Sequence, residues 1–144
     1  MERLNFNDQI KSNIEIIKEL QESYTDIVNQ EDASFENILA EVDGEEFYSS
    51  TDLYNYITEI PVSVEVRTDW VYAGFYGNQH PVDYKIVMTT GGPHIEIYGR
   101  LNHTVEPENV NMSYKDGSDS FNVTLTKEEE KTLLWFVKLF QYQC

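Results

Sequence analysis

The sequence is poor in cysteine, in positive charge and in long apolar runs. Its single cysteine, Cys144, excludes an intrachain disulfide and a zinc site built from several thiolates. Lysine and arginine number 10 against 26 acidic residues, and this net charge of −16 argues against direct nucleic-acid binding, which needs clustered cations. No stretch approaches the roughly 18 apolar residues of a membrane span, and the N-terminus lacks the apolar core of a signal peptide. We therefore expect a soluble intracellular protein that binds neither nucleic acid nor membrane.

Apolar residues make up 40% of the chain and aromatic residues 13%, which is enough to build a core. The charge is unevenly divided. Residues 1–60 hold 3 basic and 15 acidic residues, a net charge of −12, whereas residues 61–144 hold 7 and 11, a net charge of −4. Pro61 marks the seam, because the residue before a proline is disfavoured in a helix. The length predicts one domain over 1–144, with an acidic helical part at 1–60, a sheet at 61–126 and a closing helix at 127–141.

The first part has the apolar period of helices. Apolar residues recur at three- and four-residue steps over 10–28, which predicts a helix with Asn7 as its N-cap. A second short helix is predicted over 34–43. A third is predicted over 50–58, where Ser49 stands at capping-box spacing from an acidic residue.

After Pro61 the apolar period changes from about 3.6 to 2, which is typical of strands with one buried and one wet face. The alternation predicts strands over 62–70, 84–88, 94–101, 110–115 and 121–125. Thr126 and Glu129 have the spacing of a capping box and open an apolar final helix. The predicted fold class is α+β, with acidic N-terminal helices, an antiparallel sheet of four to five strands, and a C-terminal helix packed on the sheet.

The sequence offers little for catalysis. His80, His94 and His103 accompany no nucleophile motif, so we expect no catalytic triad. His94 and Glu96 share a strand face and His103 could join them as metal ligands, although ordinary polar residues on a wet face are the simpler interpretation. The acidic clusters lack the spacing of a calcium-binding loop, and the glycines at 91–92 lack the lysine and helix of a P-loop and favour a hairpin. We expect no enzyme activity, cofactor or metal.

The acidic region 1–60 is the remaining candidate site. Carboxylates three and four residues apart on a helix are separated by about 5–6 Å. Duplex DNA carries one phosphate charge per about 1.7 Å, so rows of carboxylates can present a phosphate-like field to a basic groove. We expect the tyrosines among the acids to be exposed, and exposed aromatics suit a protein interface: Tyr24, Tyr48, Tyr54 and Tyr56. The predicted partner-binding residues, each an acceptor for lysine or arginine, are Glu31, Asp32, Glu36, Glu41, Asp43, Glu45, Glu46, Asp52 and Glu59.

The segment 64–140 contains a strand ending in Trp70, a tyrosine-containing strand that runs into Thr90-Gly-Gly-Pro93, a Gly-Arg-Leu strand and a final helix with a Leu-Leu pair. In these motifs it resembles a family of small phage- and plasmid-borne accessory proteins. It departs from them at 116–120, where the family often has an Asp-Trp and a second Trp and this chain has Asp-Gly-Ser-Asp-Ser. The resemblance implies a mobile-element origin and, by association, an anti-CRISPR or antirestriction role.

Two functional hypotheses come first. One is an anti-defence protein in the cytoplasm of a host bacterium, which inhibits a DNA-binding nuclease or a CRISPR effector complex by occupying its basic groove with an acidic, DNA-mimicking surface. The alternative is a non-catalytic interaction module or adaptor that binds a protein partner through the exposed face of the sheet. A metal protein built around His94, Glu96 and His103 is the third interpretation. The patterns predict no particular oligomeric state.

Overall fold

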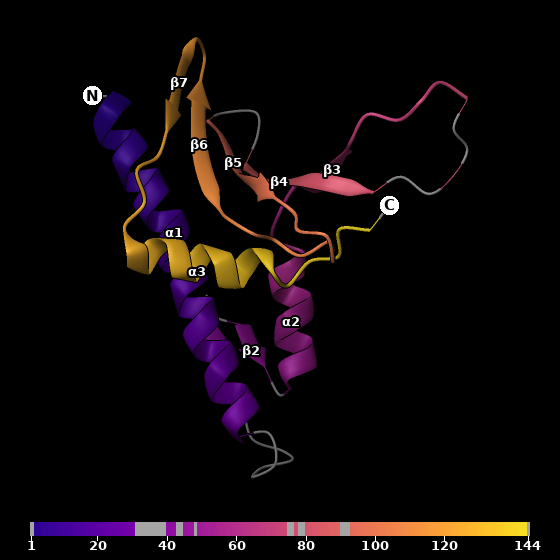
Figure 1. Cartoon of the computed structure of the whole chain (residues 1–144). Coiled ribbons are helices and arrows are strands. Elements are labelled where there is room, and N and C mark those ends of the chain that lie inside the picture. The colour runs from indigo at the N-terminus through magenta and orange to yellow at the C-terminus, as the bar shows by residue number, and fades with distance from the viewer. Residues whose placement is uncertain are drawn as a thin grey trace. The chain divides into compact units, whose positions relative to one another are not determined.

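The computed structural model describes residues 2–30, 40–42, 45–47, 49–74, 77, 80–89 and 93–143 (Figure 1), with the backbone alone at 2–7, 30 and 40–42. The chain divides into two compact units, Met1–Ile60 and Pro61–Cys144. The division falls at Pro61, where the acid-rich part of the sequence gives way to the less charged part.

The first unit is built from two helices and a short hairpin. Its elements are α1 (Glu2–Gln30), β1 (Ala40–Val42), β2 (Glu45–Phe47) and α2 (Ser50–Thr58). The side chains that form one buried stripe of α1 are Ile10, Ile14, Ile17, Leu20 and Ile27. Both α1 and β2 contact α2, and the rings of Phe47 and Tyr56 lie 5.2 Å apart. The buried stripe of α1 has the three- and four-residue spacing of a helix face that the sequence predicts.

Two sequence predictions in this unit were wrong in detail. α1 begins at Glu2 rather than after Asn7, because no glycine or proline interrupts 2–7 and an acidic residue suits the positive end of a helix. Residues 40–42, predicted as the end of a helix, form β1 and pair antiparallel with β2. The Asp-Gly dipeptide at 43–44 connects these strands, and Asp-Gly is a hairpin signal as well as a possible helix end. The rest of that predicted helix, 34–39, lies outside the described residues.

The third predicted helix is confirmed as α2. It spans Ser50–Thr58, and the hydroxyl of its N-cap Ser49 accepts a hydrogen bond from the backbone N–H of Asp52 at 3.2 Å. This bond satisfies one of the amide groups that have no partner inside the first turn of a helix.

The second unit contains a five-stranded antiparallel sheet in the order β3-β4-β5-β6-β7. The strands are β3 (Ser63–Thr68), β4 (Pro81–Thr89), β5 (His94–Arg100), β6 (Asn111–Asp116) and β7 (Asp119–Asn122). Each strand pairs with the next along the chain (Figure 1). Each also overlaps a predicted segment, although β4 extends beyond 84–88 at both ends and β7 begins two residues before 121. The predicted fold class, α+β with N-terminal helices, an antiparallel sheet and a C-terminal helix, is confirmed.

The final helix, α3 (Lys127–Val137), begins with the predicted capping box. The backbone N–H of Thr126 donates to Glu129 Oε1 at 2.9 Å, and the N–H of Glu129 donates to Thr126 Oγ1 at 3.2 Å. Beyond the helix, the Tyr142 hydroxyl donates to the carbonyl oxygen of Val137, and its ring lies 5.1 Å from the ring of Tyr84 on β4. The C-terminal segment is therefore held against the sheet. None of the helices in the described part of the chain is long and apolar enough to cross a membrane.

Candidate functional site

The acidic residues predicted from the sequence all belong to the first unit, and the four whose side chains the structure describes lie on β2 and at the two ends of α2. Glu45 and Glu46 on β2 are exposed, as are Asp52 and Glu59 at opposite ends of α2. The rise of a helix separates these two ends by about 10 Å. Glu41 belongs to β1, of which the backbone alone is described. The remaining four lie outside the described residues: Glu31, Asp32, Glu36 and Asp43.

The small hairpin places acidic residues opposite one another. In its register Glu41 is the partner of Glu46, and Val42 is the partner of Glu45. Like charges directly opposite in an antiparallel pair are destabilising, by a few tenths to about 1 kcal/mol. The hairpin therefore brings two acidic residues into register on one small element.

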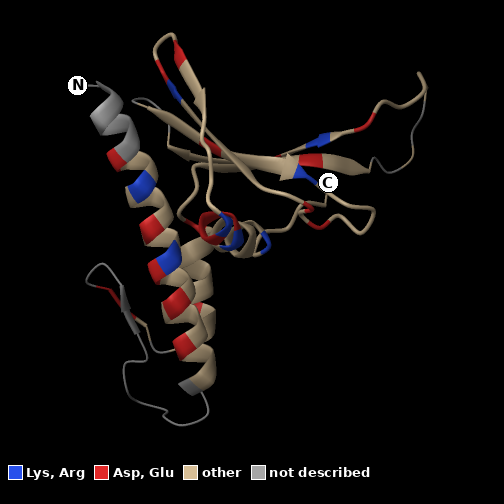
Figure 2. Ribbon diagram, turned by 60° about the vertical axis from the view of Figure 1, so that its left-hand side comes forward, with Lys and Arg blue, Asp and Glu red and all other residues tan. Residues whose placement is uncertain are grey.

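A row of carboxylates along α1 is the most regular acidic feature of the described residues. Its members, hereafter the carboxylate row, are Asp8, Glu15, Glu19, Glu22 and Asp26. They are separated by steps of seven, four, three and four residues, and all five side chains are exposed. At about 3.6 residues per turn these steps keep the five side chains within roughly 40° of one line, opposite the buried stripe, over about 27 Å of helix. Figure 2 shows acidic residues following one another down α1.

The carboxylate row is available to a partner. Among the residues whose side chains are described, no lysine or arginine lies within ion-pairing distance of the five carboxylates. The helix also carries Lys11 and Lys18, both exposed. The predicted partner-binding residues all lie at 31–59, so the row was not among them. The seven-four-three-four spacing was the signal that could have identified the row.

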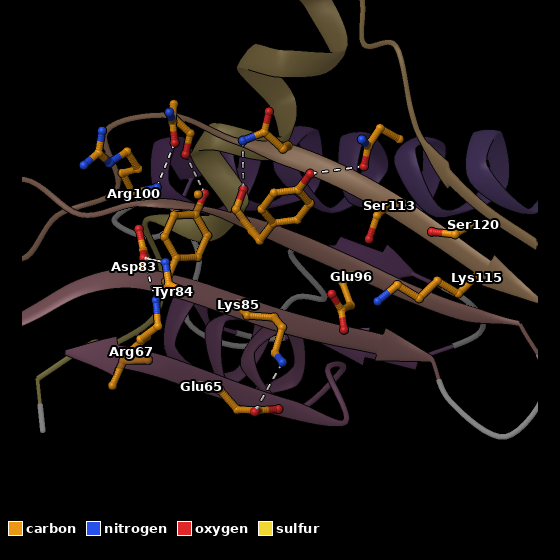
Figure 3. A pocket seen from close by; sticks show the side chains of 16 residues that line it. Glu65, Arg67, Asp83, Tyr84, Lys85, Glu96, Arg100, Ser113, Lys115 and Ser120 are labelled. Carbon is orange, nitrogen blue, oxygen red and sulfur yellow. Dashed lines mark hydrogen bonds and ion pairs between the residues drawn. The ribbon is translucent and has the colours of Figure 1, made fainter. Parts of the chain in front are cut away.

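The polar face of the sheet is the second candidate surface. Alternate side chains of the five strands line a shallow hollow of about 640 Å³ (Figure 3). Every basic residue of 61–126 lies on this face: Arg67, Lys85, Arg100 and Lys115. The sheet therefore has its positive charge on one face, whereas the other three lysines of the unit belong to α3 and its C-cap.

Two ion pairs partly neutralise the polar face, and a histidine lies beside a third carboxylate. Arg67 pairs with Asp83, with Nε and Oδ2 at 2.9 Å, and Lys85 Nζ lies 3.6 Å from Glu65 Oε1. His94 Nε2 lies 2.6 Å from Glu96 Oε1. Neither Arg100 nor Lys115 has a carboxylate within 4.0 Å in the described part of the chain. These two cations are the ones that a partner's carboxylates could bind.

The predicted metal ligands do not assemble into a site. His94 and Glu96 are neighbours on β5, whereas His103 is an exposed residue of the connection to β6. Within the described ranges no group of three His, Cys, Asp or Glu side chains could hold a metal ion. The interpretation as a metal protein therefore has no geometric support.

The aromatic residues differ from the sequence expectation. Tyr24, Tyr54 and Tyr56 are half-buried, and Tyr48 lies outside the described residues. Trp70, predicted to continue the apolar phase of a strand, follows β3 and is 98% exposed. Tyr72 and Val71 beside it are also exposed, so the most accessible aromatic residues of the described chain belong to the connection between β3 and β4.

Two of the buried phenols, those of Tyr84 and Tyr142, serve as structural hydrogen-bond donors. Loss of water on burial raises the pKa of Tyr84 and of Tyr142, and for Tyr142 the nearby Tyr84 raises it further. Both groups therefore stay protonated at neutral pH, where each donates to a backbone carbonyl oxygen, Tyr84 to Asn109 and Tyr142 to Val137.

No protein-family model matches the chain, and neither the curated proteins nor the solved structures contain a match. The resemblance to phage- and plasmid-borne accessory proteins therefore remains a prediction from the sequence.

Proposed function

We propose that this protein is an inhibitor that occupies the basic nucleic-acid-binding groove of a bacterial DNA-binding nuclease or CRISPR effector complex. The observation that carries the proposal is the carboxylate row of α1, five exposed acidic side chains in one line without a described ion-pair partner. Its role follows from electrostatics, because a line of fixed negative charge on a rigid helix can replace phosphates as acceptors for a partner's lysines and arginines.

The charge spacing supports competition with one DNA strand. The five carboxylates span about 27 Å and are separated by about 7 Å on average, which is close to the distance between every second phosphate of a DNA strand, at about 3.4 Å per phosphate. The exposed acids of β2 and α2 belong to the same unit and add to its field. A net charge of −12 on residues 1–60 would also steer the unit toward a positive groove and raise the association rate.

The test is a competition measurement. Purified CRISPR effector complexes and restriction nucleases are titrated with labelled DNA in the presence and absence of the protein, at low and at high salt. The proposal predicts that at least one enzyme loses DNA binding, and that high salt relieves the loss. If no enzyme responds at low salt, or if inhibition is independent of salt, electrostatic mimicry is wrong.

A second candidate function is a protein-binding adaptor that uses the polar face of the sheet. The hollow on this face and its two cations without a carboxylate partner, Arg100 and Lys115, favour it. A partner that binds there would lose affinity when Arg100 or Lys115 is replaced by alanine and would be indifferent to changes in the carboxylate row. Reversal of the row therefore distinguishes the two functions.

A further inference from the structure

We propose that the outer edge of β3 is a self-pairing surface, on which a second copy of this chain adds its own β3 antiparallel. The strand lies at one end of the strand order and pairs with β4 alone among the described strands. An edge strand presents backbone N–H and C=O groups that another strand can pair with. This inference does not depend on the proposed inhibitory function.

The charges of the polar face alternate across the strands and end at β3. In one cross-strand row Arg67 faces Asp83, and Asp83 faces Arg100. In the next row Glu65 faces Lys85. The first row therefore ends at the edge with a positive charge and the second with a negative charge. Arg67 is well exposed there, with 79% of its side chain accessible, and 51% of the Glu65 side chain is accessible.

A twofold-related strand would continue both rows. If Val66 lies opposite the partner's Val66, then Glu65 lies opposite the partner's Arg67, and Arg67 lies opposite the partner's Glu65. The first row would then alternate in sign from Arg100 through Asp83 and Arg67 to the partner's Glu65. Opposite charges in directly paired positions stabilise an antiparallel pair.

The charges also select this register over its neighbours. Opposite residues of an antiparallel pair lie on the same face, so symmetric registers are centred on single residues. A pairing centred on Glu65 puts Glu65 against its own copy, and a pairing centred on Arg67 does the same with arginine. Both place like charges in contact, which destabilises the pair. Of these three registers, the one centred on Val66 alone brings unlike charges together.

Exposed apolar side chains also support a pairing centred on Val66. Val62 and Trp70 are each four residues from Val66, and they are 58% and 98% exposed. Val62 directly precedes β3 and Trp70 lies two residues beyond its end at Thr68, so a twofold axis at Val66 would place exposed apolar side chains near both ends of the paired strands. Val64, 37% exposed, is a further apolar residue within the strand. The pairing would therefore cover apolar surface as well as complete the charge rows.

The overall negative charge does not prevent this contact. Residues 61–144 carry a net charge of −4 out of −16, so most of the repulsion comes from the other unit. At about 0.15 M salt the Debye length is about 8 Å, which screens distant charges more than ion pairs in contact. Self-association should therefore be measured near that salt concentration.

The first test is the mass in solution over a range of concentrations, by sedimentation or light scattering. The proposal expects the 16.8 kDa chain to form a dimer of twice that mass as concentration rises. A chain that stays monomeric at the highest concentration measured overturns it.

Charge reversal then tests the register. Arg67→Glu gives a chain with two glutamates on the paired face and Glu65→Arg gives one with two arginines, so each alone should remain monomeric. Mixed in equal amounts they should form a heterodimer, because every glutamate of one chain then meets an arginine of the other. Lys127→Glu and Glu130→Arg, reversals on α3 with the same charge changes, should leave the dimer intact. A dimer that survives either reversal at β3, or a mixture that stays monomeric, contradicts the proposal.

Disulfide capture keeps the proposal testable should a reversed chain fail to fold. In a Cys144→Ser background, Val66→Cys would place two cysteines opposite each other, with Cα atoms about 4.5–5.5 Å apart and within the range that a disulfide bridges. Ser63→Cys would place them roughly 20 Å apart in the same register. Under mild oxidation the first variant should form a covalent dimer and the second should not. Equal cross-linking of the two variants, or none, overturns the Val66-centred pairing.

Discussion

The phenol of Tyr84 on β4 donates a hydrogen bond of 2.6 Å to the backbone carbonyl oxygen of Asn109, and Gly99 of β5 leaves the space for it. A Cβ on residue 99 would lie 2.4 Å from that carbonyl oxygen and 2.9 Å from Tyr84 Cε1. The Asn109 side chain in turn accepts a hydrogen bond from the backbone N–H of Arg100 at 2.8 Å. Glycine at 99 thus lets the connection from β5 to β6 lie against the sheet beside the polar face.

Gly99→Ala should destabilise the protein by about 1–3 kcal/mol, because the added methyl group overlaps backbone atoms that cannot simply rotate away. The measurement is the free energy of unfolding from denaturant titration followed by circular dichroism. Gly74→Ala is a useful comparison, since a Cβ there meets nothing within 4 Å and the cost comes from a φ of 84° alone. If the Gly99→Ala variant is as stable as the unchanged protein, the close approach of the Asn109 backbone to residue 99 is contradicted.

Alkaline pH should destabilise the fold through the buried phenols of Tyr84 and Tyr142. The pKa values of Tyr84 and Tyr142 are raised in the folded state, so their contribution is fully present below the unfolded value of about 10. Above that pH the unfolded chain loses protons that the folded chain keeps, and stability falls by up to about 1.4 kcal/mol per pH unit for each phenol. Tyr142→Phe should reduce the slope of stability against pH above 10. An identical slope in the variant would contradict this role for Tyr142.

Much of the fold could be predicted because local signals and tertiary structure agree. The period-two alternation after Pro61 located all five strands, and the capping residues Ser49 and Thr126 located the starts of two helices. The hairpin of β1 and β2 was missed because its strands have three residues each, too few to show a period. Trp70 was misplaced because its apolar phase continues that of β3, although the strand ends at Thr68, where a register shift interrupts its pairing with β4.

The candidate site was harder to predict than the fold. The count of charged residues identified the acidic unit. The number of acidic residues per stretch of sequence, however, favoured residues 31–59 over α1, where the acidic residues are farther apart. The alignment of the five carboxylates becomes apparent when the sequence spacing of these residues is placed on one long helix. The alternation of charge across the sheet was inaccessible for a similar reason, because it depends on the strand register that pairs Arg67 with Asp83 and Glu65 with Lys85.

The ion pair between Glu65 and Lys85 should contribute little to the stability of the monomer. Its atoms are 3.6 Å apart, and the two side chains are 51% and 42% exposed. Exposed pairs of this kind contribute about 0–1 kcal/mol. Glu65→Gln should therefore change the free energy of unfolding by less than about 0.5 kcal/mol at a concentration where the chain is monomeric. A loss of 2 kcal/mol or more, measured by denaturant titration, would mean that Glu65 has a structural role in the monomer.

Reversing the charges of the carboxylate row is the most direct test of the proposed function. A chain with Glu15, Glu19, Glu22 and Asp26 changed to lysine is compared with one in which four exposed acids of the second unit are changed to lysine: Glu106, Glu108, Asp116 and Asp119. The two variants have the same net charge, and circular dichroism verifies that both fold. The measurement uses a nuclease that the unchanged chain inhibits. It gives the concentration of each variant that is needed to displace DNA from that nuclease. We predict that reversal of the row weakens inhibition by about tenfold or more while the control reversal changes it far less. Equal inhibition by the two variants would contradict the proposal that α1 replaces DNA in the groove.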